Sequence, residues 1–165
     1  MSESACNDMS VSVAAIKASP LGEELSDAQC ETLAGVMTAC AIRDQAFLIE
    51  EGQKDDTLHI LTKGNMEVVS HTGGGDYVGL QVLRGGDMLG ELGFLDGVEH
   101  SAGLRAMGNC ELIRLDRASF EGLLEKDPDL VYKVMRSIVR TVHRILRNMN
   151  FQQVELTNYI AKQNG

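Results

Sequence analysis

The chain has 165 residues, which is the length of one ordinary domain with room for an appended element. Its formal net charge is −9, and aromatic residues make up 4% of it, without any tryptophan. This composition argues against a surface that binds nucleic acid throughout, and against an aromatic platform on which bases could stack. The four cysteines are too widely spaced for an iron–sulfur cluster and are expected to be buried or incidental thiols in a reducing compartment; they are Cys6, Cys30, Cys40 and Cys110.

The N-terminal segment, residues 1–24, is predicted to be an arm that is either loose or contains a short helix. It has no basic region followed by an unbroken apolar stretch, so we expect no signal peptide. No apolar run in the chain reaches the roughly 20 residues that a membrane span requires. We therefore expect a cytoplasmic protein that has no membrane partner.

A helix is predicted over about 26–40, because Ser26 and Gln29 form a capping-box pattern and apolar residues follow at helical spacing. From 46 to 115 the pattern changes to short apolar runs separated by turn residues, which is typical of a β-sandwich or barrel. Asp116 then caps a short helix over 117–125, and Pro128 opens a long one. The order predicts an α+β fold, with a core domain over 25–127 and a long helix over 128–160.

Apolar residues recur along this long helix in alternating steps of four and three, which is the a/d pattern of a coiled coil. They are Val131, Met135, Ile138, Val142, Ile145 and Met149, and Leu156 continues the series. The pattern predicts a parallel homodimer through the helix, with packing on the helix's own domain as the alternative. A helix of about 30 residues is about 45 Å long and outruns a domain of this size, which favours the dimer.

A second stripe on the same helix is basic. It consists of Lys133, Arg136, Arg140, Arg144 and Arg147. No aspartate or glutamate occurs between Leu130 and Val154, which is unusual segregation in a chain of net charge −9. Three interpretations stay open for the stripe: a solvated or internally paired face, a docking surface for an acidic protein partner, or a contact with nucleic acid or lipid.

Residues 90–102 read Gly-Glu-Leu-Gly-Phe-Leu-Asp-Gly-Val-Glu-His-Ser-Ala. This run resembles the phosphate-binding cassette of cyclic-nucleotide-binding domains, the family of catabolite activator proteins, kinase regulatory subunits and gated channels. The resemblance covers about residues 25–150 and includes the order of the helices and several turn glycines, which are Gly52, Gly64, Gly86 and Gly90. It implies an eight-stranded double-stranded β-helix, a jelly-roll-like β-roll, with an N-terminal helix and a long C-terminal dimerisation helix.

The resemblance also implies a ligand site. Its residues are Gly90, Glu91, Leu92, Gly93, His100, Ser101 and Ala102. In the family, the glutamate of the cassette holds the ribose 2′-hydroxyl, backbone N–H groups at the turn cradle the cyclic phosphate, and an arginine pairs with that phosphate. Glu91 occupies the position of the glutamate, although a carboxylate there could also serve only to tie the cassette to the roll. No cofactor is implied, and the expected ligand is cAMP by default, with cGMP next.

His100 stands where the family has the arginine. An imidazole is mostly neutral at pH 7 and reaches less far than a guanidinium, so its bond to a phosphate is the weaker one. Three interpretations follow: a weakened phosphate ligand, part of a site reshaped for another anion or nucleotide, or an ordinary residue in a site that binds nothing. The base-facing positions of the family's long helix fall at Ile145 and Leu146, which cannot form the hydrogen bonds. The polar candidates nearby are Thr141, Asn148 and Asn150.

No enzymatic constellation appears, because the four histidines lack metal-like spacing and no Ser/His/Asp arrangement stands out. The sequence ends at Gly165, which leaves no room for the helix-turn-helix domain of the family's transcription factors, so we do not expect direct DNA recognition. We expect a cytoplasmic, non-enzymatic regulatory module that binds a cyclic nucleotide and signals to a protein partner of unknown identity. The alternative is a ligand-free, dimeric scaffold for protein interaction.

Overall fold

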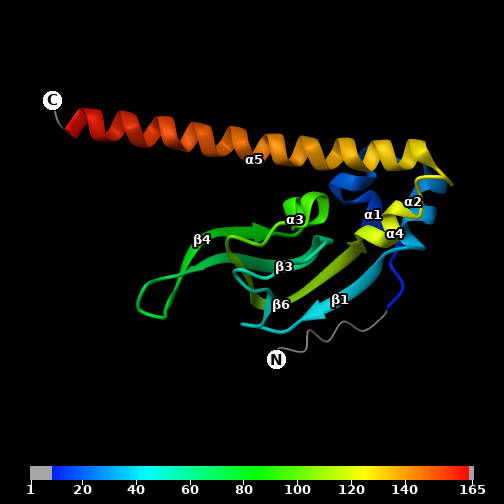
Figure 1. Ribbon diagram of the computed structural model, residues 1–165, viewed down its shortest axis with the longest axis horizontal. Helices are drawn as coiled ribbons and strands as arrows, with labels where there is room; N and C mark the ends of the chain where they lie inside the picture. The colour runs from blue at the N-terminus through cyan, green and yellow to red at the C-terminus, as the bar shows by residue number, and fades with distance from the viewer. Residues whose placement is uncertain (1–8, 164–165) are drawn as a thin grey trace.

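The fold is α+β, as predicted: an antiparallel sheet, short helices of which most lie at one end of it, and one long C-terminal helix above it (Figure 1). The computed structural model describes residues 9–163. Within these residues, no helix combines the length and the apolar character needed to cross a bilayer.

Two short helical segments form the described part of the predicted arm. They are α1 (Val13–Lys17) and the 3-10 helix η1 (Pro20–Glu24). Ile16 and Leu21 are buried in the core, so this part of the chain packs on the domain because it supplies apolar side chains to it. Residues 1–8 of the arm, which include Cys6, lie outside the described residues.

Helix α2 (Asp27–Ala34) begins at the capping box that the sequence predicts. The Ser26 N–H donates to Gln29 Oε1 at 3.1 Å, and the Gln29 N–H donates to Ser26 Oγ at 3.2 Å. The prediction that this helix continues to residue 40 is wrong, because it ends at Gly35 and the chain then forms a strand. Cys40 and Ile42 are buried there and alternate with more exposed neighbours. Burial of every second residue is the pattern of a half-buried strand and not of a helix.

Six strands are described, and all their pairings are antiparallel. They are β1 (Thr38–Ile42), β2 (Phe47–Ile49), β3 (Thr57–His71), β4 (Tyr77–Arg84), β5 (Met88–Leu89) and β6 (Gly103–Asp116). The order along the sheet is β1-β6-β3-β4, while β2 also pairs with β6 and β5 also pairs with β3. Strand β4 therefore lies at an edge, and most of its residues are exposed.

Six strands are found rather than the eight predicted, because two pairs of apolar runs are continuous. The runs on either side of Gly64 both belong to β3, and those on either side of Gly108 both belong to β6. The β3–β6 register shifts around Gly64, whose φ is +91°. A Cβ there would lie 2.6 Å from the Asn109 carbonyl oxygen, so only glycine lets β3 continue past β6 at this point. Closure of the sheet into a roll stays a prediction.

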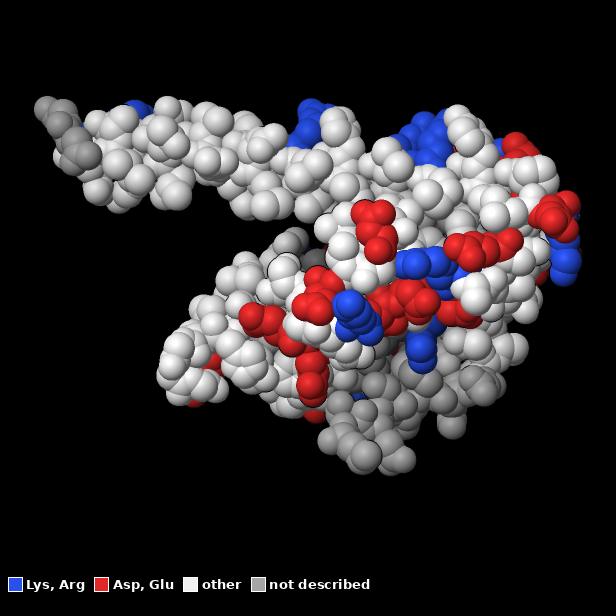
Figure 2. Space-filling view, viewed as in Figure 1, with Lys and Arg blue, Asp and Glu red and all other residues white. Residues whose placement is uncertain are grey.

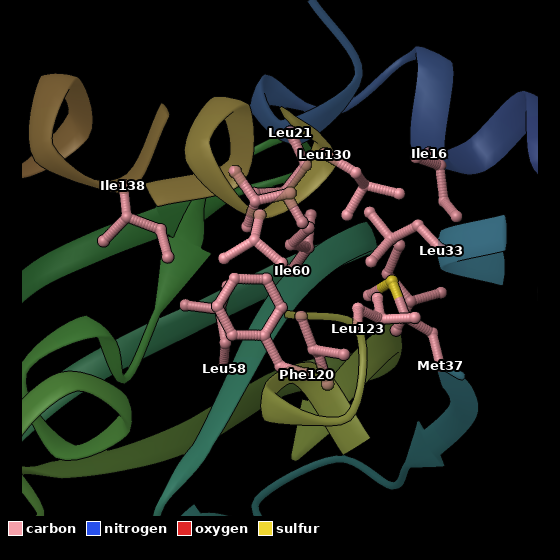
Figure 3. Close-up of a cluster of buried hydrophobic side chains, with 14 of the residues drawn as sticks. Ile16, Leu21, Leu33, Met37, Leu58, Ile60, Phe120, Leu123, Leu130 and Ile138 are labelled. Carbon is pink, nitrogen blue, oxygen red and sulfur yellow. The ribbon is translucent and has the colours of Figure 1, made fainter. Parts of the chain in front are cut away.

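Three helices follow or interrupt the later strands. They are α3 (Glu91–Asp96), α4 (Arg117–Glu121) and α5 (Pro128–Gln163). Asp116 caps α4 as predicted, since its Oδ1 accepts from the Ser119 N–H at 2.8 Å, although α4 ends earlier than residue 125. The largest core cluster lies where α1, α2, α4 and the start of α5 meet the sheet, with Ile60, Phe120 and Leu130 among its members (Figure 3).

The two ends of helix α5 lie in different environments. Leu130, Val134 and Ile138 are fully buried in the domain core, whereas the C-terminal half projects past the sheet and is exposed (Figure 1). Two residues of the predicted dimer seam, Val131 and Ile138, therefore belong to the core of their own chain, and the alternative of own-domain packing holds for them. Met135 and Val142 pack at the margin of the same cluster; of the remaining two, Met149 is freely exposed.

Candidate functional site

A cavity of about 580 Å³ lies between the cassette, β4 and helix α5. Figure 2 shows the cleft where α5 overhangs the rest of the domain. All seven residues that the sequence predicts as a ligand site line this cavity. They are Gly90, Glu91, Leu92, Gly93, His100, Ser101 and Ala102. The structure thus brings the two ends of the cassette to one wall, although their roles toward a ligand stay predictions.

The close packing of α3 against its neighbours depends on Gly93. A Cβ at this position would lie 2.4 Å from the Asp55 carbonyl oxygen and 3.0 Å from His100 Nε2, so a larger residue would displace the helix. Arg117 fixes α3 from the other side, because its Nε donates to the Phe94 carbonyl at 2.7 Å and its Nη2 donates to the Gly93 carbonyl at 2.7 Å. These contacts hold the cassette turn against the residue Asp55 before β3 and against Arg117 at the start of α4.

Glu91, the first residue of α3, presents an acceptor without a donor. Its Oε1 is buried and has no hydrogen-bond partner within the described residues. Burial raises the pKa of the Glu91 carboxyl above its ordinary value, since the ionised form loses solvation there. A carboxylate oxygen in this state can accept a hydrogen bond from a donor that reaches it, which would relieve this cost.

His100 is positioned by its backbone while its ring stays unsatisfied. Its N–H donates to the Gln53 carbonyl at 2.9 Å, and its carbonyl accepts from the Gly52 N–H at 2.7 Å. The ring lies against Gly93, and its Nε2 is buried with no partner in the described part of the chain. A ring nitrogen in this state can donate to or accept from a group that enters the cavity, depending on its tautomer.

Sequence reasoning missed a second histidine behind the cassette. His59 on β3 is 2% exposed, and its Nε2 lies 2.9 Å from Asp55 Oδ2. Its ring and that of His100 both flank Gly90. Burial lowers the pKa of His59, and this outweighs the raising effect of the Asp55 carboxylate. The spacing Asp55 to His59 was the available signal, but it indicates a pair only once the loop before β3 is known to fold back.

The stability of the protein should decrease as the pH falls below about 6.5, because His59 is protonated more readily in the unfolded chain than in the folded one. Asp55 opposes this effect, while Arg114 and His100 add to it. We expect the wild type to lose about 1 kcal/mol of unfolding free energy between pH 7.5 and 5.5 from this group. Urea denaturation of His59→Gln should show a shallower pH dependence. The control is His143→Gln on exposed α5, and equal slopes for all three proteins would contradict the assignment.

Helix α5 forms the wall opposite the cassette. Its cavity-lining residues are Thr141, Arg144, Ile145 and Asn148. Ile145 lines the cavity, as expected for one of the two base-facing positions of the family's long helix. Leu146, the second of these positions, is not among the lining residues. Thr141 and Asn148 are two of the three polar candidates, and both bring hydrogen-bonding side chains to the cavity.

The basic stripe of α5 divides into residues that are paired and residues that are not. Arg136 and Arg140 both contact the Glu24 carboxylate, the former at 2.7 Å, and Lys133 contacts Asp129 at 2.8 Å. This bears out internal pairing for the N-terminal part of the stripe. Neither Arg144 nor Arg147 makes an ion pair with any described residue, so the unpaired charge lies at the level of the cavity and beyond it.

Comparison with known proteins identifies the family. The model of the cyclic nucleotide-binding domain matches residues 40–127, which is more than half of the chain. The chain belongs to the cyclic nucleotide-binding domain family. A cyclic nucleotide-binding domain from Methylobacillus flagellatus superposes with a TM-score of 0.80 at 20% identity, covering 87% of this chain and 83% of that one. The Thermus thermophilus catabolite activator protein gives a TM-score of 0.71 at 22% identity, over 84% of this chain and 63% of that one.

Sequence relatives include full-length regulators. The cAMP-activated global transcriptional regulator CRP of Salmonella typhimurium is 29% identical over 136 residues, covering 79% of this chain and 65% of that protein. A Mycobacterium bovis protein described as an uncharacterized NTE family member is 26% identical over 130 residues, which is 79% of this chain and 22% of that protein. The chain thus spans about two thirds or less of the length of these relatives.

Proposed function

We propose that this protein is a cytoplasmic regulatory module that binds a cyclic nucleotide, with cAMP as the default ligand and cGMP next. The observation that carries the proposal is the open cavity whose cassette wall holds two unsatisfied buried atoms, Glu91 Oε1 and His100 Nε2. Unpaired polar atoms in a folded interior are costly, and a ligand that pairs with them recovers that cost. Membership of the cyclic nucleotide-binding family supports the choice of ligand class.

In the proposed complex, Glu91 accepts from the ribose 2′-hydroxyl, and the backbone from Gly90 to Gly93 contacts the phosphate. His100 and Ser101 replace the usual clamp, and Thr141 and Asn148 are within the same cavity to meet the base. The scaffold alternative would be favoured by a cavity filled with its own side chains. Phe94, the bulkiest side chain of α3, instead packs on Phe120 at a ring-centroid distance of 5.4 Å and leaves the cavity open, which supports ligand binding.

We further propose a homodimer through the part of α5 from Val139 onward, in a register shifted from the predicted one. Exposed or half-buried residues recur there in alternating steps of three and four and form a seam: Val139, Val142, Leu146, Met149, Gln153, Leu156 and Ile160. All but one are apolar, and a single polar residue at such a position is a common device for fixing register. Pairing of two such seams would cover apolar surface that one chain leaves in water.

The same helix would transmit the signal. Thr141 and Asn148 line the cavity, while Val142 and Met149, each the next residue along the chain, belong to the seam. A ligand that contacts the first pair changes the position that α5 prefers, and thereby the surface that the dimer offers to a protein partner. Differential contact with two positions of α5 is the energetic requirement for such a switch.

Calorimetric titration with cAMP and with cGMP tests the proposal. We expect the wild type to bind one of them, and we expect His100→Arg to bind it about 10–100-fold more tightly, because a guanidinium adds charge-assisted bonds to the phosphate. His143→Arg on exposed α5 adds the same charge outside the cavity and should leave the affinity unchanged. Absence of heat with either nucleotide up to millimolar concentration, for wild type and His100→Arg alike, would favour the ligand-free scaffold.

A further inference from the structure

The described residues that line the cavity carry more negative than positive charge, which disfavours an anionic ligand. Among the described lining residues, three carry carboxylates, namely Asp87, Glu91 and Glu99, and one carries a permanent positive charge, Arg144. A cyclic phosphodiester brings a further negative charge into this space. His100 compensates less than an arginine would, since an imidazole lacks the permanent charge and the two parallel donors of a guanidinium. A site that holds such a ligand therefore depends on Arg144 more than on the cassette.

Arg144 is available to neutralise an anionic ligand. Its neighbours along the stripe, Arg136 and Arg140, are committed to Glu24 on η1, which holds them on the side of the domain core. Arg144 lies one turn further along α5, lines the cavity, and has no ion-pair partner within the described residues. An unpaired guanidinium beside a cavity is well suited to bind a phosphate, because it carries a permanent charge and can donate two parallel hydrogen bonds.

We propose that Arg144 is the phosphate-binding cation of this protein. From helix α5, it would take the role of the arginine that the family has in the cassette, at the position where this chain has His100. The proposal rests on the proposed function, because it concerns the same cavity and the same class of ligand. In this arrangement, the group that neutralises the phosphate lies on α5 and not in the cassette. The cassette contributes Glu91 and backbone N–H groups, and α5 contributes the guanidinium. The anionic group of the ligand would then bridge the cassette and α5 directly.

The position of Arg144 distinguishes this arrangement from one centred on the cassette. It lies on α5 between Val142 and Leu146, two residues of the proposed seam. Binding of the phosphate would pull on the segment of α5 that pairs with a second copy, without passing through the cassette. Coupling between ligand and helix would therefore include an ion pair at Arg144, in addition to the contacts of Thr141 and Asn148.

The experiment compares Arg144→Gln with Arg147→Gln, which removes the same charge from the next turn of the stripe but outside the cavity. Titration with cAMP and with cGMP should show a loss of affinity of about 10–100-fold for Arg144→Gln, by the same factor for each nucleotide that the wild type binds, because both carry the same phosphate. Arg147→Gln should stay within about twofold of the wild type. Adding His100→Arg to Arg144→Gln should restore binding, since the charge returns from the opposite wall.

Two results would overturn the proposal while leaving the proposed function in place: equal affinities for Arg144→Gln and Arg147→Gln, or a loss confined to cGMP, which would place Arg144 against the base. Circular dichroism and sedimentation of each variant establish that folding and oligomeric state are unchanged. If the wild type and His100→Arg bind neither nucleotide, the proposed function itself fails, and this assignment fails with it.

Discussion

Glu91→Gln is expected to weaken cyclic-nucleotide binding by about 10–100-fold and to stabilise the empty protein at the same time. The carboxylate forms the stronger hydrogen bond with a ribose hydroxyl, so its loss costs affinity. In the empty protein, Oε1 is buried without a donor, and burial raises the pKa of the group. Ionisation of Glu91 therefore reduces the stability as the pH rises from about 4.5 through the higher folded-state pKa.

We expect Glu91→Gln to raise the unfolding free energy at pH 7.5 by about 1 kcal/mol, measured by urea denaturation without ligand. Glu99→Gln is the matched control, because Glu99 lines the same cavity but is exposed and lies 3.9 Å from Lys54. Glu99→Gln should not weaken the affinity, since it removes a negative charge from the cavity, and it should leave the stability nearly unchanged. A Glu91→Gln protein that is less stable and binds as tightly as the wild type would show that Glu91 only ties the cassette to the sheet.

Ile138→Ala and Leu146→Asp should separate the two faces of α5. Ile138 is fully buried against its own domain, so its truncation should lower the unfolding free energy by about 2–5 kcal/mol through lost burial and the cavity left behind. Leu146 is 52% exposed and belongs to the proposed seam, so a carboxylate there should leave the domain folded but convert the dimer into a monomer. Thermal denaturation and sedimentation equilibrium measure the two effects.

Tyr132→Asp provides a control for surface charge, because Tyr132 is an exposed apolar residue of the same helix near its start, away from the overhanging half. Tyr132→Asp should strongly affect neither the stability of the domain nor its dimerisation. A wild-type protein that sediments as a monomer would contradict the dimer, and a Leu146→Asp protein that still dimerises would contradict the register of the seam. A fully stable Ile138→Ala domain would contradict the placement of this residue in the core.

Signals confined to a few neighbouring residues predicted the structure well. The capping box at Ser26 and Gln29 and the cap at Asp116 each depend on contacts within one turn of chain, and the structure contains both. The order of helices and strands followed from changes in hydrophobic period. The cassette residues also proved to line one cavity, although the sequence alone could not show that the cavity is open.

Features that depend on distant partners were predicted less well. The step pattern of α5 is shared by two faces, so spacing could not tell that Ile138 faces the core and Leu146 faces solvent. The helix predicted to reach residue 40 gave way to β1 because β6 supplies a pairing partner for those residues. Likewise, Glu24 lies more than a hundred residues from Arg136 and Arg140 in sequence, so only the folded chain shows that Arg144 is left unpaired.

The division of α5 between domain core, cavity and overhanging seam links two equilibria that are usually measured separately. If the ligand favours the position of α5 in which two seams pair, association must favour the ligand by the same factor, because linkage is reciprocal. The apparent nucleotide affinity would then change with the protein concentration in the cell, since mass action sets the fraction of paired chains. The helix would make the abundance of the protein an input to its response, alongside the nucleotide itself.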